Sequence, residues 1–275
     1  MTHLHSPDGY SIDGPLHAGR FFVVFRVARG DEVFVCKRPT PRFAGDGAAA
    51  ALLETEARAL ERLAGAAAPT VVASGDDPRG PYLVTTLAPG VPLAPSGPAG
   101  ATDPEATIAH VLRALAVVHA AGVAHGDVSP SNVLVRGADV TLIDFALARF
   151  PADASARAPT AGDFRGTVLY AAPELARGEA ATYASDVFGA AACLLHVVTG
   201  LPPRRSSSLP MGLVEAAEEP VAPALVHALE RAAPALGPWL ARALATEPGA
   251  RPSAADIAGE ASVLLGERLR GSRSA

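Results

Sequence analysis

The sequence has 275 residues, of which 49% are hydrophobic and 19% are charged, a composition typical of a globular protein. Its net charge of −5 argues against a broad basic surface for nucleic acid or an anionic membrane. Cys36 and Cys193 are the only cysteines, too few for a disulfide framework or a paired-cysteine zinc site. Because no signal sequence or membrane-spanning run is found either, we expect a cytoplasmic protein with reduced thiols and no membrane partner.

Strand patterns dominate the first third of the chain. Runs rich in Val, Phe and Thr, bounded by turn residues, predict strands at residues 21–28, 33–37, 70–74 and 82–87. Residues 48–64 have apolar positions at helical spacing and predict one helix among these strands. Residues 89–104 are rich in Pro, Gly and Ala, which indicates a loop that connects two lobes.

Helical patterns dominate from Glu105 onward. Helices are expected at residues 106–121, 184–199, 222–233, 238–245 and 254–270, short strands at 133–135 and 140–143, and an irregular loop at 151–164. We therefore predict an α+β, bilobal fold. A small β-rich N-terminal lobe (residues 10–88) and a larger helical C-terminal lobe (residues 89–270) form one domain, followed by a frayed tail at 271–275.

Three polar residues lie where apolar elements give way to loops. Asp127 follows an apolar helix, and a carboxylate there can accept a proton from a hydroxyl nucleophile. Asn132 offers an amide oxygen that suits Mg²⁺. Asp144 ends an apolar strand, where a buried carboxylate is costly unless it binds a partner. Each residue alone is as well explained by a helix cap or a turn, but their order and spacing favour a phosphoryl-transfer site.

Lys37 ends the strand at residues 33–37, where its ammonium group can bind phosphate oxygens. A lysine at a strand end is usually solvated, so this position alone is weak support. Glu56, in the predicted helix at residues 48–64, is the acid we expect to pair with Lys37. Glu54 and Glu61 are competing choices.

These residues together resemble the signature of the eukaryotic-like serine/threonine protein kinases of bacteria, and the resemblance covers nearly the whole chain. His125-Gly126-Asp127 is similar to the His-Arg-Asp motif of that family, and Asp144-Phe145-Ala146 to its Asp-Phe-Gly motif. The resemblance implies the bilobal kinase fold and the use of ATP with Mg²⁺ (or Mn²⁺).

The resemblance also assigns catalytic roles. Asp127 becomes the catalytic base, and Asn132 and Asp144 become the metal ligands. Lys37 becomes the contact to the α- and β-phosphates, with Glu56 as its partner.

The nucleotide-binding positions follow from the same resemblance. Gly19 belongs to a glycine-rich loop over the phosphates, and Val24 lies on the strand after it. Thr85 stands at the gatekeeper position at the back of the adenine site. Thr86 to Ala88 would present backbone groups to adenine.

The C-terminal half distinguishes protein kinases from related enzymes. Ala172-Pro173-Glu174 resembles the end of a protein-kinase activation segment, and Arg251 matches the arginine that pairs with Glu174 in that family. Asp186 resembles the start of the long central helix. Small-molecule kinases of the aminoglycoside type share the His-Gly-Asp loop but generally lack the glutamate–arginine pair.

Several positions depart from the family pattern. His17 and Phe22 replace two of the three glycines of the glycine-rich loop, which should loosen or reshape the cover over the phosphates. Ser129 replaces a lysine that contacts the γ-phosphate in the family. Loss of this charged contact should lower the rate of phosphate transfer by roughly a hundredfold. Gly126 replaces the arginine that binds a phosphorylated activation loop, and Ala146 replaces a flexible glycine.

Three functions are consistent with these residues. The first is a kinase that moves the γ-phosphate of ATP to serine or threonine of an unidentified protein substrate, and we favour it because Lys37, Asp127, Asn132 and Asp144 are all present. The second is a pseudokinase that binds nucleotide or acts as a scaffold, which the altered glycine-rich loop supports. The third is a small-molecule kinase, against which the segment at residues 167–174 and Arg251 argue.

Overall fold

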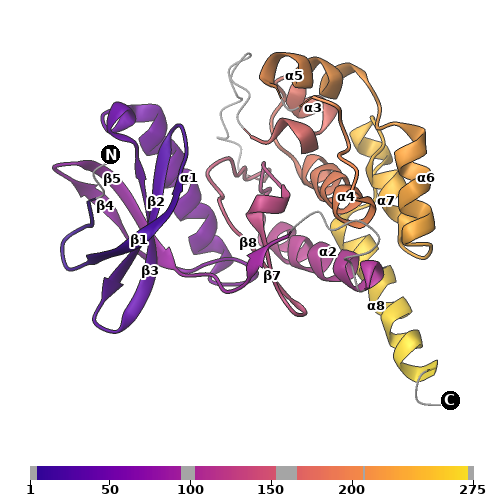
Figure 1. Cartoon of the computed structure of the whole chain (residues 1–275), viewed down its shortest axis with the longest axis horizontal. Helices are drawn as coiled ribbons and strands as arrows, with labels where there is room; N and C mark the ends of the chain where they lie inside the picture. Colours follow the sequence, from indigo (N-terminus) through magenta and orange to yellow (C-terminus); the bar gives the residue numbers. More distant parts are fainter. Residues whose placement is uncertain (1–4, 94–102, 153–165, 207, 272–275) are drawn as a thin grey trace.

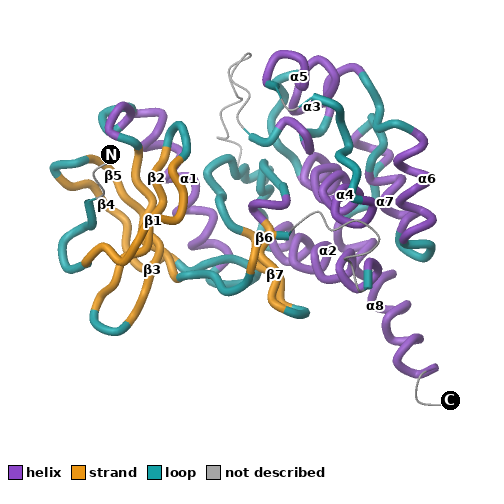
Figure 2. The backbone as a smooth tube through the Cα atoms, viewed as in Figure 1, coloured by secondary structure: helices purple, strands orange, loops and turns teal. Residues whose placement is uncertain are grey.

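Two structural units lie side by side in this chain, one built around a sheet and the other around helices (Figure 1). The computed structural model describes residues 5–93, 103–152, 166–206 and 208–271. The sheet belongs to the N-terminal third of the chain, and most of the helices belong to the remainder (Figure 2). The predicted α+β fold, with a β-rich N-terminal region and a helical C-terminal region, is therefore confirmed.

The N-terminal unit is a five-stranded antiparallel sheet with the order β1-β2-β3-β5-β4. Its strands are β1 (Ser11–Ala18), β2 (Phe22–Arg29), β3 (Glu32–Pro39), β4 (Val71–Asp77) and β5 (Gly80–Thr86). Side chains alternate along β2, so Val23, Phe25 and Val27 are buried on one face of the sheet. Strand β1 was not predicted, because this edge strand is largely exposed and lacks an apolar alternation.

Helix α1 (Gly47–Leu63) packs against β4 and β5. It begins at Asp46, whose carboxylate accepts a hydrogen bond from the Ala48 N–H at 2.8 Å. It ends where Ala64 turns into the left-handed region with φ +47°. Its buried face carries Glu56 toward the sheet.

A small three-stranded sheet joins the two units. It consists of β6 (Val91–Pro92), β7 (Val133–Arg136) and β8 (Asp139–Leu142), all antiparallel. The Leu142 N–H donates to the Ala67 oxygen at 2.8 Å and so ties this sheet to the segment after α1. Asn132 directly precedes β7, and Asp144 follows the end of β8 after one intervening residue.

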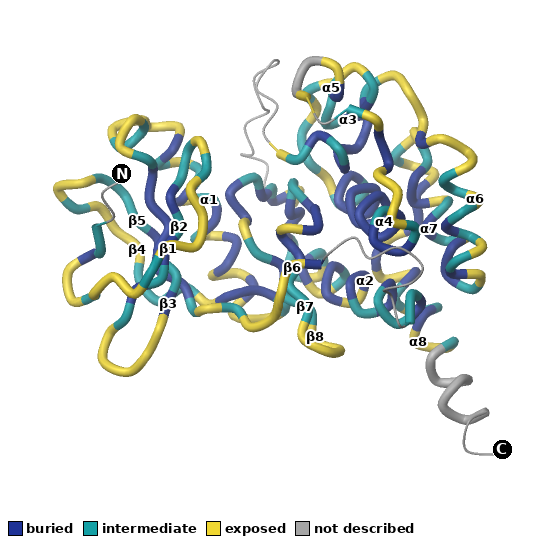
Figure 3. The backbone as a smooth tube through the Cα atoms, in the orientation of Figure 1, coloured by how far each residue is buried: buried dark blue, intermediate teal, exposed yellow. Residues whose placement is uncertain are grey.

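Helix α4 (Tyr183–Thr199) lies in the centre of the helical unit, and most of its residues are buried (Figure 3). A capping box between Thr182 and Ser185 begins it, and Gly200 with φ +73° ends it. The other helices are α2 (Pro104–Ala120), α3 (Pro173–Ala176), α5 (Leu209–Glu218), α6 (Pro223–Ala232), α7 (Gly237–Ala243) and α8 (Ala254–Gly271). Short 3₁₀ turns are η1 (Pro41–Phe43), η2 (Pro130–Asn132), η3 (Val168–Tyr170) and η4 (Pro248–Ala250).

The helical unit differs from the prediction at α5, which the sequence did not indicate because its start is a serine- and proline-rich run. The loop predicted at residues 89–104 contains β6, and its residues 94–102 lie outside the described part of the chain. Residues 153–165 and 272–275 also lie outside it, and with them most of the loop predicted at residues 151–164 and of the tail predicted at 271–275. None of the described helices is long and apolar enough to cross a membrane.

Candidate active site

Lys37 lies where the two units meet. Its ammonium group donates to Glu56 Oε2 on α1 at 2.6 Å and to Asp144 Oδ1 after β8 at 2.7 Å. Burial disfavours the charged ammonium, but the two carboxylates outweigh burial and raise the pKa of Lys37, so the group stays protonated. One ammonium group facing two carboxylates leaves excess negative charge, which suits an added cation.

Asp144 adopts a backbone conformation that is uncommon for a residue with a side chain, with φ +65°. Its carboxylate is 47% exposed, whereas the next residue, Phe145, is fully buried against the His125 ring. Desolvation alone would raise the pKa of Asp144. The charge of the Lys37 ammonium and its hydrogen bond have a larger, opposite effect, so the pKa of Asp144 lies below the usual value. Asp144 is therefore an ionised carboxylate that is open to solvent.

Asp127 and Asn132 lie in the loop between α2 and β7. The Asn132 amide nitrogen donates to the backbone oxygen of Asp127 at 2.9 Å and to its Oδ2 at 3.1 Å, which leaves the amide oxygen available for a cation. The Thr167 N–H donates to Asp127 Oδ1 at 2.8 Å. Burial raises the pKa of Asp127, although the Thr167 N–H opposes this shift. An oriented carboxylate with a raised pKa is suited to accept a proton.

Asp186, near the start of α4, binds the backbone of this loop through hydrogen bonds. Its carboxylate accepts the backbone N–H of His125 at 2.6 Å and that of Gly126 at 2.9 Å, and it lies 3.0 Å from His119 Nε2. His125 Nε2 lies 3.0 Å from the Ile143 oxygen, which links the loop to the end of β8. The buried central helix therefore sets the position of the loop.

Two positions expected over the phosphates lie on the β1–β2 hairpin. Val24 is directly opposite Lys37 in the register of β2 and β3. Gly19 lies in the turn between β1 and β2, where its N–H donates to the Phe22 oxygen at 2.9 Å.

The positions expected near adenine lie at the end of β5. Thr85 is buried. The Thr86 N–H donates to the Thr70 oxygen at 2.9 Å, and its hydroxyl accepts the Thr70 N–H at 3.0 Å, so the backbone nitrogen of Thr86 is already engaged. Ala88 lies in the connection from β5 to β6.

The donor set fits a magnesium ion that arrives with a nucleotide. Asp144 and Asn132 offer hard oxygen atoms, and Mg²⁺ in such sites is held by one or two protein groups together with phosphate oxygens. Within the described ranges, no group of three or more His, Cys, Asp or Glu side chains is arranged to hold a metal ion. Asp144 and Asn132 therefore suit a hard divalent cation that phosphate oxygens also hold.

A family model of the protein kinase domain matches residues 10–260. The chain belongs to the protein kinase domain family. Serine/threonine-protein kinase PknL of Mycobacterium tuberculosis is 34% identical over 201 residues, which cover 70% of this chain and 50% of PknL. PknD of the same species is 34% identical over 59% of this chain and 24% of PknD. PknB of Mycolicibacterium smegmatis is 32% identical over 62% of this chain and 28% of PknB. The match thus spans half or less of these relatives.

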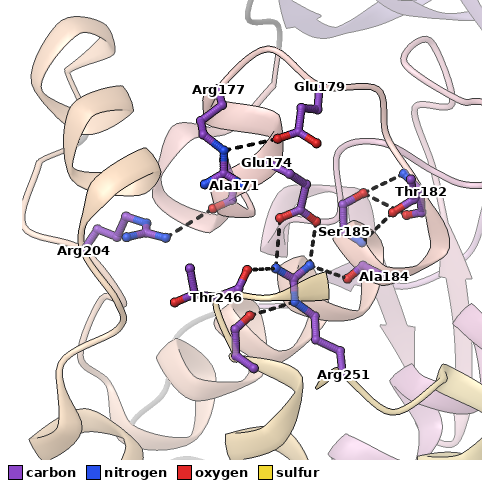
Figure 4. Close-up of polar contacts among 11 residues, drawn as sticks. Ala171, Glu174, Arg177, Glu179, Thr182, Ala184, Ser185, Arg204, Thr246 and Arg251 are labelled. Atoms are coloured by element: carbon purple, nitrogen blue, oxygen red, sulfur yellow. Dashed lines mark hydrogen bonds and ion pairs between the residues drawn. The ribbon is translucent and has the colours of Figure 1, made fainter. Parts of the chain in front are cut away.

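A buried ion pair anchors the end of the activation segment of this kinase domain (Figure 4). The Arg251 guanidinium donates to Glu174 Oε1 at 2.6 Å and to Oε2 at 2.9 Å. Its remaining N–H groups donate to the backbone oxygens of Ala184, Ala245 and Thr246. Because every N–H of the guanidinium has an acceptor, the pair is fully satisfied although it is buried.

Phe22, at a position where the family pattern has a glycine, lies against Lys37. The Lys37 Nζ is 4.9 Å from the centre of its ring. The ammonium group is thus enclosed by two carboxylates and an aromatic face. From the sequence we predicted a loosened or reshaped cover over the phosphates, but not this contact. A phosphate group that binds Lys37 must compete with this ring.

The other three residues that depart from the family pattern, Gly126, Ser129 and Ala146, fit their local surroundings. Gly126 has φ +84°, and an added Cβ would lie 2.4 Å from the Leu147 oxygen. Ser129 is fully buried, and its hydroxyl lies 3.0 Å from that of Ser131, so it does not project as a lysine would. Ala146 is also buried.

Sequence reasoning missed three features of this site. The first is the uniqueness of Lys37. It is the only lysine in the whole sequence, and this would have strengthened its assignment to the site. The backbone contact from Thr167 to Asp127 had no sequence signal. Arg204 is buried and donates to the Ala171 oxygen and to α5, which ties the segment before Glu174 to a helix that was not predicted (Figure 4).

Proposed function

We propose that this kinase domain moves the γ-phosphate of ATP to serine or threonine side chains of a protein substrate. The observation that carries the proposal is one polar network that unites residues far apart in sequence. Lys37 contacts Asp144, Asn132 contacts Asp127, and the Ile143 N–H donates to the backbone oxygen of Asn132 at 2.9 Å between them. In this proposal, residues 10–88 and 89–270 are the two lobes of one catalytic unit in the cytoplasm.

Each residue then has a defined task. Asp127 accepts the proton of the substrate hydroxyl, held in position by the Thr167 N–H and the Asn132 amide. Lys37 binds the α- and β-phosphate oxygens while Glu56 holds its ammonium group in place. Mg²⁺ (or Mn²⁺), when bound with ATP to Asn132 and Asp144, would neutralise charge on the phosphate oxygens.

Substitution of the catalytic base tests the proposal. Asp127→Asn keeps the shape of the side chain but removes its capacity to accept the proton, and we expect phosphate transfer to fall by roughly a hundredfold or more. The assay measures transfer of labelled phosphate from ATP to a generic protein substrate with Mg²⁺ and with Mn²⁺. Asp139→Asn, at the exposed start of β8, is the control and should match wild type. Equal transfer by wild type and Asp127→Asn would refute the proposal.

A pseudokinase is the second candidate, and the contact of Phe22 with Lys37 favours it. A single lysine permits a direct test, because an amine-reactive acyl-phosphate analogue of ATP can label no other lysine side chain. Labelling of Lys37 that ATP prevents, without transfer to any protein, would support the pseudokinase. Transfer that Lys37→Met abolishes would exclude it.

A further inference from the structure

A second cavity lies on the N-terminal unit, with a volume of about 600 Å³, within the usual range for small-molecule sites. It is lined by Val23 and Phe25, which alternate along β2 with Val24, so it opens on the opposite face of the sheet from Lys37. Three arginines also line it: Arg38, Arg42 and Arg79. We call this cavity the arginine pocket. It is separate from the nucleotide site proposed above.

The arginines converge because two loops are packed directly against each other. Arg38, near the end of β3, donates to Asp77 Oδ1 at 3.0 Å and to the Gly80 oxygen at 3.1 Å in the β4–β5 turn. At Gly80 an added Cβ would lie 2.8 Å from the Ala44 oxygen in the segment between β3 and α1. This close approach brings the turn that carries Arg79 to the segment that carries Arg42.

The two outer arginines are positioned by their neighbours. The Asp77 carboxylate, which holds the Arg38 guanidinium, also accepts the Arg79 backbone N–H at 2.9 Å and so fixes the turn. The Arg42 guanidinium lies 5.5 Å from the centre of the Phe43 ring, which in turn packs against Phe21. The pocket is therefore built by specific contacts.

The charge of the pocket is unusual for a protein with a net charge of −5. None of the described residues that line it is acidic. Asp77 forms an ion pair with Arg38 and also interacts electrostatically with Arg79, but neither Arg42 nor Arg79 forms an ion pair with a carboxylate in the described part of the chain. Like charges held near one another are unfavourable, and a bound anion removes this repulsion.

We propose that the arginine pocket binds a small organic phosphate monoester. Arginine guanidinium groups match phosphate oxygens in pairs, so Arg42 and Arg79 hold the phosphate. Pro41 and Ala44, the apolar lining residues that are not buried, supply surface for the organic group. An anion without an apolar group makes no contact with this apolar surface, so it binds more weakly.

The test measures binding of phenyl phosphate to the full chain by calorimetry, with inorganic phosphate and phenol as comparison probes. We expect phenyl phosphate to bind more tightly than either probe, and Arg42→Ala/Arg79→Ala to weaken its binding by about tenfold or more. The control Arg136→Ala/Arg205→Ala changes two exposed arginines elsewhere and should bind as wild type. Lys37→Met should also bind as wild type, which separates this pocket from the nucleotide site. Unchanged binding in Arg42→Ala/Arg79→Ala, or lost binding in Lys37→Met, would overturn the proposal.

A measurement on wild type needs no variant to fold. Phenylglyoxal modifies accessible arginines, and mass spectrometry locates the sites. We expect phenyl phosphate to protect Arg42 and Arg79 while leaving Arg136 reactive. Protection of all three arginines alike, or of none, would contradict the proposal.

Discussion

Gly126 occupies a backbone position that admits little but glycine. Its φ of +84° disfavours any residue with a side chain, and the Leu147 oxygen fills the space that a Cβ would need. The local backbone therefore explains why glycine occupies position 126, independently of the function of the arginine that the family has there. Because Gly126 directly precedes Asp127, a strained residue here would also displace the loop that carries Asp127.

We predict that Gly126→Ala lowers the free energy of unfolding by about 1–3 kcal/mol. Gly137→Ala is the matched control, because Gly137 also has positive φ (+63°) but open space around its Cβ position. Urea denaturation of both variants separates the cost of the clash from the cost of the dihedral angle. Equal losses for the two variants would show that the Leu147 oxygen imposes no additional constraint.

His196 makes the stability of the helical unit depend on pH. Burial lowers its pKa, and its Nδ1 lies 2.8 Å from the Tyr170 hydroxyl. The unfolded chain therefore binds a proton below pH about 6.5 more readily than the folded chain does. The stabilisation is complete above that pH and is lost as the pH falls through the lower, folded pKa.

We predict that His196→Gln, which keeps a hydrogen-bonding group for Tyr170, reduces the fall in melting temperature between pH about 7 and 5. Melting curves recorded across this range check the prediction. An unchanged slope in His196→Gln would mean that this histidine does not contribute.

At the scale of elements, the Glu174–Arg251 pair joins α3 to the segment just before α8 (Figure 4). We predict that Arg251→Met costs about 3–5 kcal/mol of stability, because it leaves a buried carboxylate without its partner. The exposed pair of Arg177 and Glu179 is the comparison, and Arg177→Met should cost less than about 1 kcal/mol.

A double-mutant cycle with Glu174→Gln isolates the interaction energy of the buried pair. The double variant should lose less than the sum of the two single losses, since neither charge is then left alone. Strict additivity in chemical denaturation would show that the two groups do not stabilise each other.

At the scale of the whole molecule, the proposed nucleotide site is shared by the two units, so ATP with Mg²⁺ should raise the melting temperature. Binding at a hundred times the Kd stabilises by about 2.7 kcal/mol. We predict a larger rise for Phe22→Gly at the same nucleotide concentration, because the ring no longer competes for Lys37; the contact is worth about 0.5–2 kcal/mol.

Phe21→Leu is the control for this measurement, because the neighbouring Phe21 ring packs against Phe43 instead of Lys37. A nucleotide-dependent rise that is equal in wild type and Phe22→Gly would show that the ring does not obstruct the site.

The sequence alone determined most of the fold and the members of the candidate site. Helices such as α2 and α4 and the strands β2 and β3 follow from apolar periodicity, which is a local property of the chain. Asp127, Asn132 and Asp144 were proposed from their residue types, order and spacing, and Lys37 from the resemblance to the protein kinases. These features need no knowledge of which segments touch.

Tertiary structure alone decided the features that depend on contacts between distant segments. The ring of Phe22 over Lys37, the Leu147 oxygen beside Gly126 and the convergence of Arg42 with Arg79 have no signature in local sequence. The edge strand β1 and helix α5 were missed because their own patterns are weak and the rest of the fold supports them. Local pattern selects an element, whereas packing between elements places each side chain against its partner.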